Sequence, residues 1–88
     1  MSIEFDPAKA RSNLRKHGVS FAHAEQALFD PNALTVEDPD SRSEQRHITL
    51  GMDSLGRLII VVHSQRGERT RLISARKASP GESARYHA

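Results

Sequence analysis

Hydrophobic residues change their spacing near Pro31, and this change divides the chain into two parts. Before Pro31 they recur every three or four positions, which is the period of an amphipathic helix. After Pro31 they alternate with polar residues, which is the period of a strand. A short strand candidate, "SIEF" at residues 2–5, precedes both parts.

Two helices are predicted in the first part, at residues 7–17 and 21–29. Asp6 is a suitable N-cap for the first helix, Gly18 is suited to end it, and Ser20 is a suitable N-cap for the second. Because only residues 18–20 join the two helices, we expect them to form a helical hairpin.

The first helix has two different stripes. Ala10 and Leu14 lie four positions apart and are expected to face the core. Another stripe is polar and consists of Lys9, Asn13, Lys16 and His17. In the second helix, the apolar stripe consists of Phe21, Ala24 and Leu28.

Four strands are predicted after Pro31, at residues 33–38, 45–53, 57–65 and 69–77. A polar loop at 39–44 and two tight turns connect them, which is typical of an antiparallel meander. The third strand is apolar on both faces and is therefore expected to be central. Residues 79–82, "SPGE", form a capping box that starts a short last helix.

These elements predict one α+β domain over residues 1–88, in which a helical hairpin packs on a four-stranded antiparallel meander with a short C-terminal helix. The formal net charge is +2, but it is unevenly distributed. Residues 57–88 contain seven Lys or Arg and two acids, whereas residues 30–56 contain two Arg and six acids. A basic C-terminal third predicts a face that attracts anions.

Several classes of function are disfavoured by the residues that are missing. The chain has no cysteine, and its five histidines lack metal-ligand spacing, so we expect no metal site. Neither a phosphate-binding glycine loop nor a nucleophile elbow is present, so we expect no cofactor. No apolar run reaches membrane-spanning length, and the chain is expected to work in the cytoplasm.

The remaining candidates are cations near the strand ends. In a meander, Arg46, His63 and Arg66 should share one end of the sheet with Arg69 and Arg71. Arg76 and Lys77 should lie toward the opposite end. This placement conflicts with any single site that uses all of them.

Such residues suit the cleavage of RNA without a metal. The reaction needs a base for the 2′-hydroxyl, cations for the phosphorane and an acid for the 5′-oxygen. Histidine serves as either base or acid near neutral pH, and arginine grips two phosphate oxygens. Structural roles are open as well: His63 at the edge of the core, His17 at a helix C-terminus, and Arg76 paired with Glu82.

Three stretches of the chain, in this order, resemble the BrnT family of bacterial toxins. In the first stretch, "IEFDPAKARSNLRKHGVSFAHAEQALFDP", the matching positions are Phe5, Asp6, Lys9, Asn13, residues 16–19, Phe21, Ala24 and Asp30. The middle of the chain matches at Glu44, Arg46 and Gly51. In the last stretch, "RLISARKASPGESARY", the matching positions are Arg71, residues 73–76, Ala78, Glu82 and Tyr86.

The resemblance implies a RelE-like fold and a ribonuclease that stops growth by cutting RNA. It also implies a BrnA-like antitoxin as partner, two copies of each protein in the complex, and DNA contact mainly through the antitoxin. With the chemistry above, His63 is expected to be the general acid or base, with Arg46 and Arg76 stabilising the phosphorane. The residues expected to position RNA are Lys16, His17, Arg66 and Arg71.

An alternative is a non-catalytic subunit that binds the antitoxin or regulates a DNA-bound complex. A chain of 88 residues has a thin core, and the acidic segment at 37–44 suits a partner-binding role. Growth arrest on expression without a partner would distinguish the toxin from this subunit.

Overall fold

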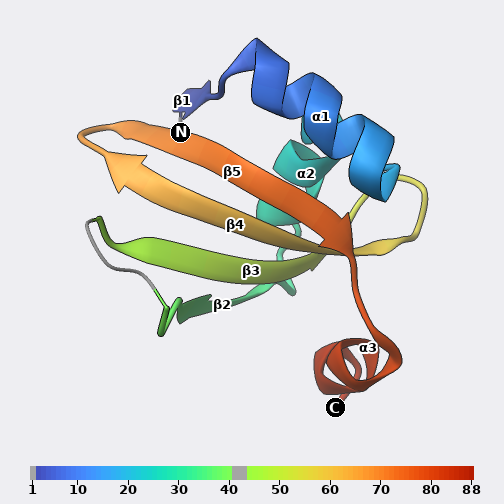
Figure 1. The fold of residues 1–88 in the computed structure, drawn as a ribbon. Coiled ribbons are helices and arrows are strands. Elements are labelled where there is room, and N and C mark those ends of the chain that lie inside the picture. Colours follow the sequence, from blue (N-terminus) through green and yellow to red (C-terminus); the bar gives the residue numbers. More distant parts are fainter. Residues whose placement is uncertain (1, 41–43) are drawn as a thin grey trace.

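The computed structural model describes residues 2–40 and 44–88, so part of the predicted loop at 39–44 lies outside the described residues. These residues form a single five-stranded sheet with three helices (Figure 1). The elements in chain order are β1 (Ser2–Glu4), α1 (Pro7–His17), α2 (Phe21–Leu28), β2 (Leu34–Glu37), β3 (Arg46–Met52), β4 (Leu58–Arg66), β5 (Arg69–Lys77) and α3 (Pro80–Tyr86).

The sheet has the strand order β1-β5-β4-β3-β2. Strands β2 to β5 form the predicted antiparallel meander, and β4 is central as expected. The predicted count of four strands is wrong, because β1 pairs in parallel with β5 and makes the sheet mixed. Residues 2–4 pair with residues 69–71 across almost the whole chain, so no local pattern marks this pairing.

The predicted caps explain where the helices begin and end. The Asp6 side chain accepts a hydrogen bond from the Ala8 amide, and Gly18 ends α1 in the left-handed conformation. At α3, Ser79 and Glu82 form the expected capping box.

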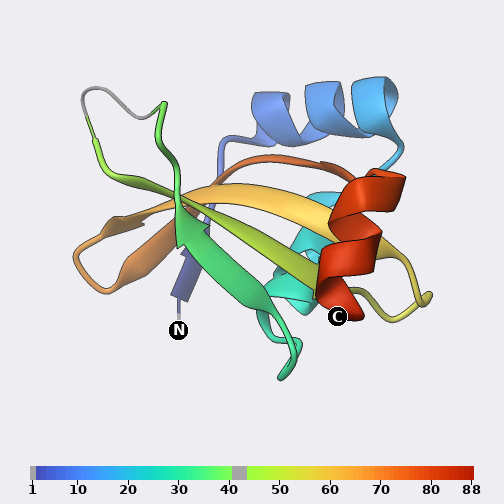
Figure 2. The same ribbon diagram turned by 90° about the horizontal axis from the view of Figure 1, so that it is seen from below.

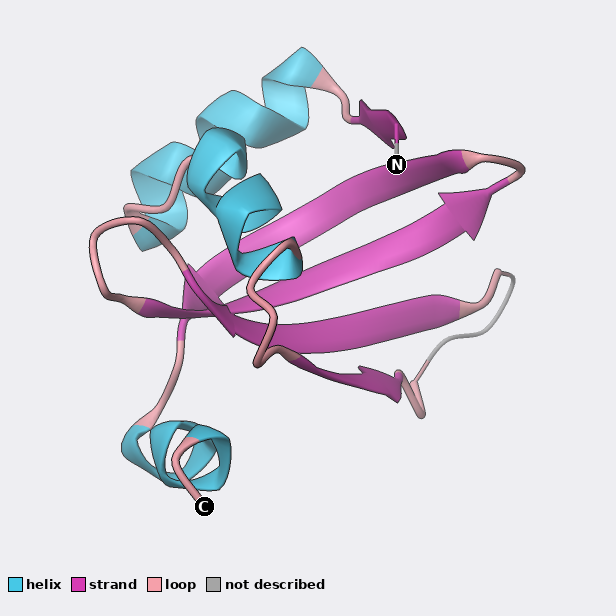
Figure 3. Cartoon of the chain, turned by 180° about the vertical axis from the view of Figure 1, so that it is seen from behind, coloured by secondary structure: helices cyan, strands magenta, loops and turns pink. Residues whose placement is uncertain are grey.

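The two N-terminal helices do not form the predicted hairpin on one face of the sheet. Figure 3 shows α2 lying across one face, while α1 follows the outer edge of β5. In Figure 2 they lie on opposite sides of the sheet. This arrangement, with five strands, differs from the expected RelE-like one.

The side chain of Asn13 explains the position of α1. Its amide nitrogen donates to the Ala75 carbonyl oxygen at 2.8 Å, and its amide oxygen accepts from the Ala75 amide at 3.0 Å. It therefore satisfies the edge of β5 beyond β1, where no strand among the described residues pairs. A third bond, to the Val19 carbonyl oxygen, ties the end of α1 to the start of α2.

The core lies between α2 and the sheet. It consists of Val19, Phe21, Ala24, Ala27, Ile59, Val61, Leu72 and Ala75. The expectation for Ala10 holds, since it packs partly buried against this cluster. Leu14, which was expected in the core, is 51% exposed because α1 turns its Asn13 side toward the sheet.

Candidate active site

The two faces of the sheet carry different residues. Gly51 of β3 faces α2, since a Cβ atom there would lie 2.1 Å from the Ala27 carbonyl oxygen. Alternation along β3 places Thr49 and His47 on this same side, which we call the α2 face. On the opposite side, which we call the α3 face, Leu50 lines a groove with α3.

A pair of histidines lies on the α2 face, at the end of the sheet near the β4–β5 turn. His63 of β4 lies directly opposite His47 of β3, and the two rings stack with their centroids 5.8 Å apart. The Nε2 atom of His63 lies 2.8 Å from the Thr49 hydroxyl oxygen. That hydroxyl lies 2.7 Å from the hydroxyl of Thr35, so a chain of hydrogen bonds from β2 orients the His63 ring.

The surroundings of His63 favour its neutral form. Burial, and secondarily the charge of His47, hold the pKa of His63 below the ordinary value of 6.5. The β4–β5 pairing also shifts its register between Val62 and His63. Bulges of this kind are frequent beside active sites, where they direct a side chain. A histidine with a lowered pKa at such a bulge is suited to accept a proton near neutral pH.

Arginines lie at the same end of the sheet but on the α3 face. Arg46 pairs in register with Ser64, and Ser64 pairs with Arg71. The hydroxyl of Ser64 is buried and has no hydrogen-bond partner among the described residues. Arg71 lies 3.7 Å from Glu4, and no described residue forms an ion pair with Arg46.

Arg66 lies at the end of β4, opposite Arg69. Its guanidinium lies 3.3 Å from Glu44, a contact between two partly exposed side chains. Surface pairs of this kind contribute little to stability, so an anion can displace the carboxylate.

Arg76 lies toward the other end of the α3 face, opposite Ile60. Two of its nitrogens donate to the two Glu82 oxygens, each at 2.8 Å. The hydrogen bond from Arg76 is the main cause that lowers the pKa of Glu82 to about 2. The predicted structural role of Arg76 therefore exists, and this pair fastens α3 to β5.

Lys16 and His17 lie in a shallow cleft between α1 and β5. Lys9, Ser12, Asn13, Ile73 and Ser74 complete its lining. The polar stripe predicted on α1 therefore faces one cleft. Arg76 lies two positions beyond Ser74 of the lining and on the same face of β5. No described residue forms an ion pair with Lys9, Lys16 or His17.

The predicted site residues therefore form two groups. One end of the sheet brings together His63, Arg46, Arg66 and Arg71, with the histidine and the arginines on opposite faces. The other end brings together Arg76, Lys16 and His17. Three positions along β4 separate the row of His63 from the row of Arg76, which is about 10 Å.

His47 is a candidate that the sequence did not reveal. Its partner His63 is 16 positions away, and only the register of β3 against β4 places the rings together. The sequence does contain a pattern that could have indicated this pair. His47 and Thr49 alternate on one predicted strand, and a tight turn joins that strand to the strand of His63.

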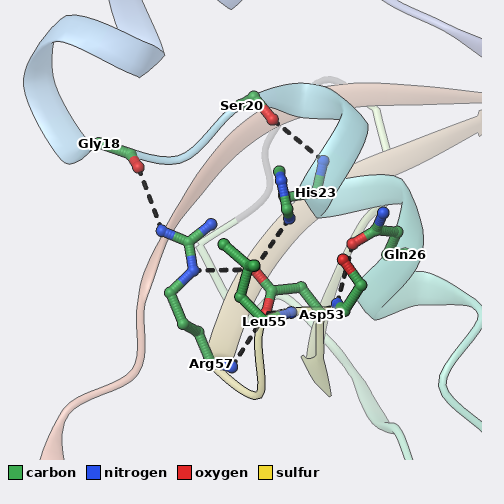
Figure 4. A network of polar contacts seen from close by, with 8 residues as sticks. Gly18, Ser20, His23, Gln26, Asp53, Leu55 and Arg57 are labelled. Carbon is green, nitrogen blue, oxygen red and sulfur yellow. Dashed lines mark hydrogen bonds and ion pairs between the residues drawn. The ribbon is translucent and has the colours of Figure 1, made fainter.

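The contact between His23 and Asp53 has a structural role (Figure 4). The Asp53 carboxylate is buried and accepts from the Leu55 and Arg57 amides and from the Arg57 side chain. His23 lies 3.2 Å from it. Burial raises the pKa of Asp53, but these hydrogen bonds outweigh burial and lower it. The network braces the β3–β4 turn against α2.

Tyr86 has a similar structural task at α3. Its hydroxyl donates to the Asp30 carboxylate, which also accepts from the Met52 amide. The bond to Asp30 is the main cause that raises the pKa of Tyr86. Tyr86 therefore ties the last helix to the segment between α2 and β2.

Among residues 2–40 and 44–88, no group of three or more His, Asp or Glu side chains could hold a metal ion. Within that same part of the chain, none of the helices has the length and apolar character needed to cross a membrane.

Comparison with known proteins identifies the family. A family described as "ribonuclease toxin, BrnT, of type II toxin-antitoxin system" matches residues 5–82. The crystal structure of the Brucella abortus ribonuclease toxin BrnT superposes with a TM-score of 0.70 at 30% identity, covering 90% of this chain and 97% of that one. No curated protein matches the chain. The chain thus belongs to the BrnT family of ribonuclease toxins of type II toxin–antitoxin systems, which implies a protein antitoxin as its partner.

Proposed function

We propose that this protein is an endoribonuclease that cuts RNA by acid–base catalysis without a metal ion. The observation that carries the proposal is the stacked His47–His63 pair, with Arg46 one position away on β3 and Arg66 three positions away on β4. Membership of a ribonuclease toxin family supports RNA as the substrate.

The two histidines suit the two proton transfers of the reaction. Neutral His63 takes the proton of a ribose 2′-hydroxyl, and the 2′-oxygen forms a bond to phosphorus. As the bond between phosphorus and the 5′-oxygen breaks, protonated His47 gives its proton to that oxygen. The products are a 2′,3′-cyclic phosphate and a 5′-hydroxyl.

The cationic side chains of the site contact the RNA at two separate phosphates. Arg46 lies at the end of β3. It stabilises the phosphorane when the RNA passes around this end of the sheet. Arg66 and Arg71 bind the neighbouring phosphates of the RNA at the same end of the sheet. Arg76 lies too far along the sheet to share that phosphate, so we place it, with the cleft of Lys16 and His17, on a second phosphate.

The partner and the cellular location are proposed from the interpretation of the chain as a toxin. We propose that a BrnA-like antitoxin neutralises the chain in the cytoplasm, in a complex with two copies of each protein. Contact with DNA in that complex belongs to the antitoxin. A non-catalytic regulatory subunit is the second candidate, supported by the exposed apolar residues Leu34 and Val36.

The experiment is cleavage of a labelled RNA oligonucleotide by the purified chain in EDTA. We expect cleavage that yields a 2′,3′-cyclic phosphate and that stops when the ribose at the cut position is replaced by 2′-deoxyribose. A requirement for added divalent cations, or cleavage of the deoxy-substituted position, contradicts the mechanism. Normal growth of cells that express the chain alone, together with no cleavage, favours the regulatory subunit.

A further inference from the structure

An apolar groove on the α3 face has no function in the proposed reaction. It lies between α3 and the sheet and encloses about 180 Å³. Its lining consists of Leu34, Val36, Ile48, Leu50, Ile60, Glu82 and Arg85. The groove is mostly apolar, and its charged groups lie on α3.

The groove adjoins an open strand edge. β2 ends the strand order, and no described element pairs with its outer side. All four residues of β2 are exposed, and the apolar Leu34 and Val36 are 45% and 52% exposed. Such an edge presents unpaired amides and carbonyls and is a template for another strand. Figure 2 shows β2 at the margin of the sheet. Glu82 and Arg85 of α3 contribute to the lining of the groove.

We infer that β2 and this groove form the docking surface for an extended segment of the antitoxin, which adds as a sixth strand beside β2. The proposal names the place on the chain where the partner implied by its family binds. It does not depend on the identity of the catalytic histidines.

The chemistry of the surface defines the segment. Added strands give affinity through main-chain hydrogen bonds and specificity through alternate side chains. Leu34 and Val36 point to one face, so the segment needs apolar residues at alternate positions. No described residue forms an ion pair with Arg85 or Arg46, so acidic residues beside the apolar ones would complement this face. RNA is the poorer occupant, because the groove offers apolar side chains and no aromatic ring for base stacking.

This position also explains inhibition. A segment along β2 and over the groove would lie between Arg46 at one end of the α3 face and Arg76 at the other. It would prevent RNA from crossing that face without touching the histidine pair.

The test compares two charge substitutions in the full-length chain. L34K/V36K places two lysines in the docking surface, at side chains that are already half exposed. L55K is the matched control, since Leu55 is 66% exposed on the β3–β4 turn, away from the groove. The probe is the antitoxin, taken as the protein encoded beside the gene of this chain, and its affinity is measured by calorimetry.

We expect L34K/V36K to weaken antitoxin binding about 30-fold or more, as loss of two central contacts does, and L55K to leave it unchanged. Hydrogen exchange of the wild-type complex should show new protection of the β2 amides. Equal affinity of L34K/V36K and wild type overturns the inference, as does binding without protection of β2. The inference is also overturned if the wild-type chain dimerises through β2 and L34K/V36K loses this dimer but still binds the antitoxin.

RNA cleavage by both variants is measured in parallel. Retained cleavage with lost antitoxin binding supports the docking surface. A wild-type chain that binds the antitoxin through β2 but cuts no RNA supports the docking surface and contradicts only the ribonuclease mechanism.

Discussion

His63 and His47 are chemically alike, but the proposed reaction gives them different roles because of their positions. His63 is held by Thr49 and has a lowered pKa because it is partly buried and faces His47. It is therefore mostly neutral at neutral pH and able to accept a proton. His47 lies beside it on β3 and is the proton donor in the proposed reaction.

The His47→Gln substitution separates these roles. We expect the cleavage rate to fall by about 100-fold or more through loss of the acid. The pH profile of the cleavage rate should also change. Its acidic limb should move to higher pH, because the positive neighbour that lowers the pKa of His63 is gone.

The measurement is single-turnover cleavage across pH, with His87→Gln as the control at the end of α3. An unchanged profile in the His47 variant would show that His47 takes no part in proton transfer.

At the scale of elements, each helix has a specific contact that sets its position against the sheet. Asn13 attaches α1, the missing side chain of Gly51 admits α2, and the Arg76–Glu82 pair attaches α3. These attachments position the cleft of Lys16 and His17 and the groove beneath α3.

Replacement of Asn13 should loosen α1. Asn13→Ala removes three hydrogen bonds and leaves the Ala75 amide and carbonyl buried without partners. We expect a loss of about 2–4 kcal/mol in the free energy of unfolding, measured by urea denaturation. Ser12→Ala, the neighbouring change on α1, serves as control. A loss below about 0.5 kcal/mol would show that water replaces these bonds.

Gly51 tests the approach of α2 to β3. In Gly51→Ala the new Cβ atom would meet backbone atoms of Ala27, which cannot move without shifting the helix. We expect destabilisation of about 2–3 kcal/mol by overpacking. Gly81→Ala is the matched control, because a Cβ atom there meets nothing within 4 Å. Equal stability of the two variants contradicts the close packing.

Arg76 requires two substitutions, because it both holds Glu82 and is proposed to contact phosphate. Arg76→Ala should lower kcat/KM by about 10-fold or more through loss of the phosphate contact. Glu82→Gln keeps the arginine and should reduce kcat/KM much less, although α3 is loosened. Equal losses in both, with equal loss of helix signal in circular dichroism, would mean that Arg76 acts only through α3.

The direction of the pKa shift of Glu82 determines how the Arg76–Glu82 pair affects stability as the pH changes. The pKa of Glu82 in the folded protein, about 2, lies below its ordinary value of 4.5. Its contribution to stability is complete above pH 4.5 and is lost as the pH falls through about 2. Assays of Arg76 variants near neutral pH are therefore unaffected by this titration.

The local elements were predictable because their signals are local. The caps at Asp6, Ser20 and Ser79 and the alternation along the later strands match the observed helices and strands closely. The β1–β5 pairing and the position of α1 depend on contacts between distant residues, such as Asn13 with Ala75.

The candidate site was predictable only in part, for the same reason. The meander order correctly grouped His63 with Arg46 and separated both from Arg76. The opposite faces of His63 and Arg46, and the stacking of His47 on His63, depend on strand register. A shift by one residue would reverse the faces, and sequence periodicity does not determine register to that accuracy.

At the scale of the whole molecule, the sheet separates two tasks. The α2 face holds the core and, at one end, the histidine pair. The α3 face holds the arginines, the apolar groove and the free edge of β2. Because the proposed antitoxin surface and the histidines do not overlap, a chain can lose catalysis and still bind its partner.

The most direct test of the account is the rate of RNA cleavage in EDTA by wild type, His63→Ala and His87→Ala, each checked for the same unfolding temperature. We predict that His63→Ala lowers the rate by about 100-fold or more, while His87→Ala matches wild type. Cleavage by a folded His63→Ala variant at the wild-type rate would contradict the account.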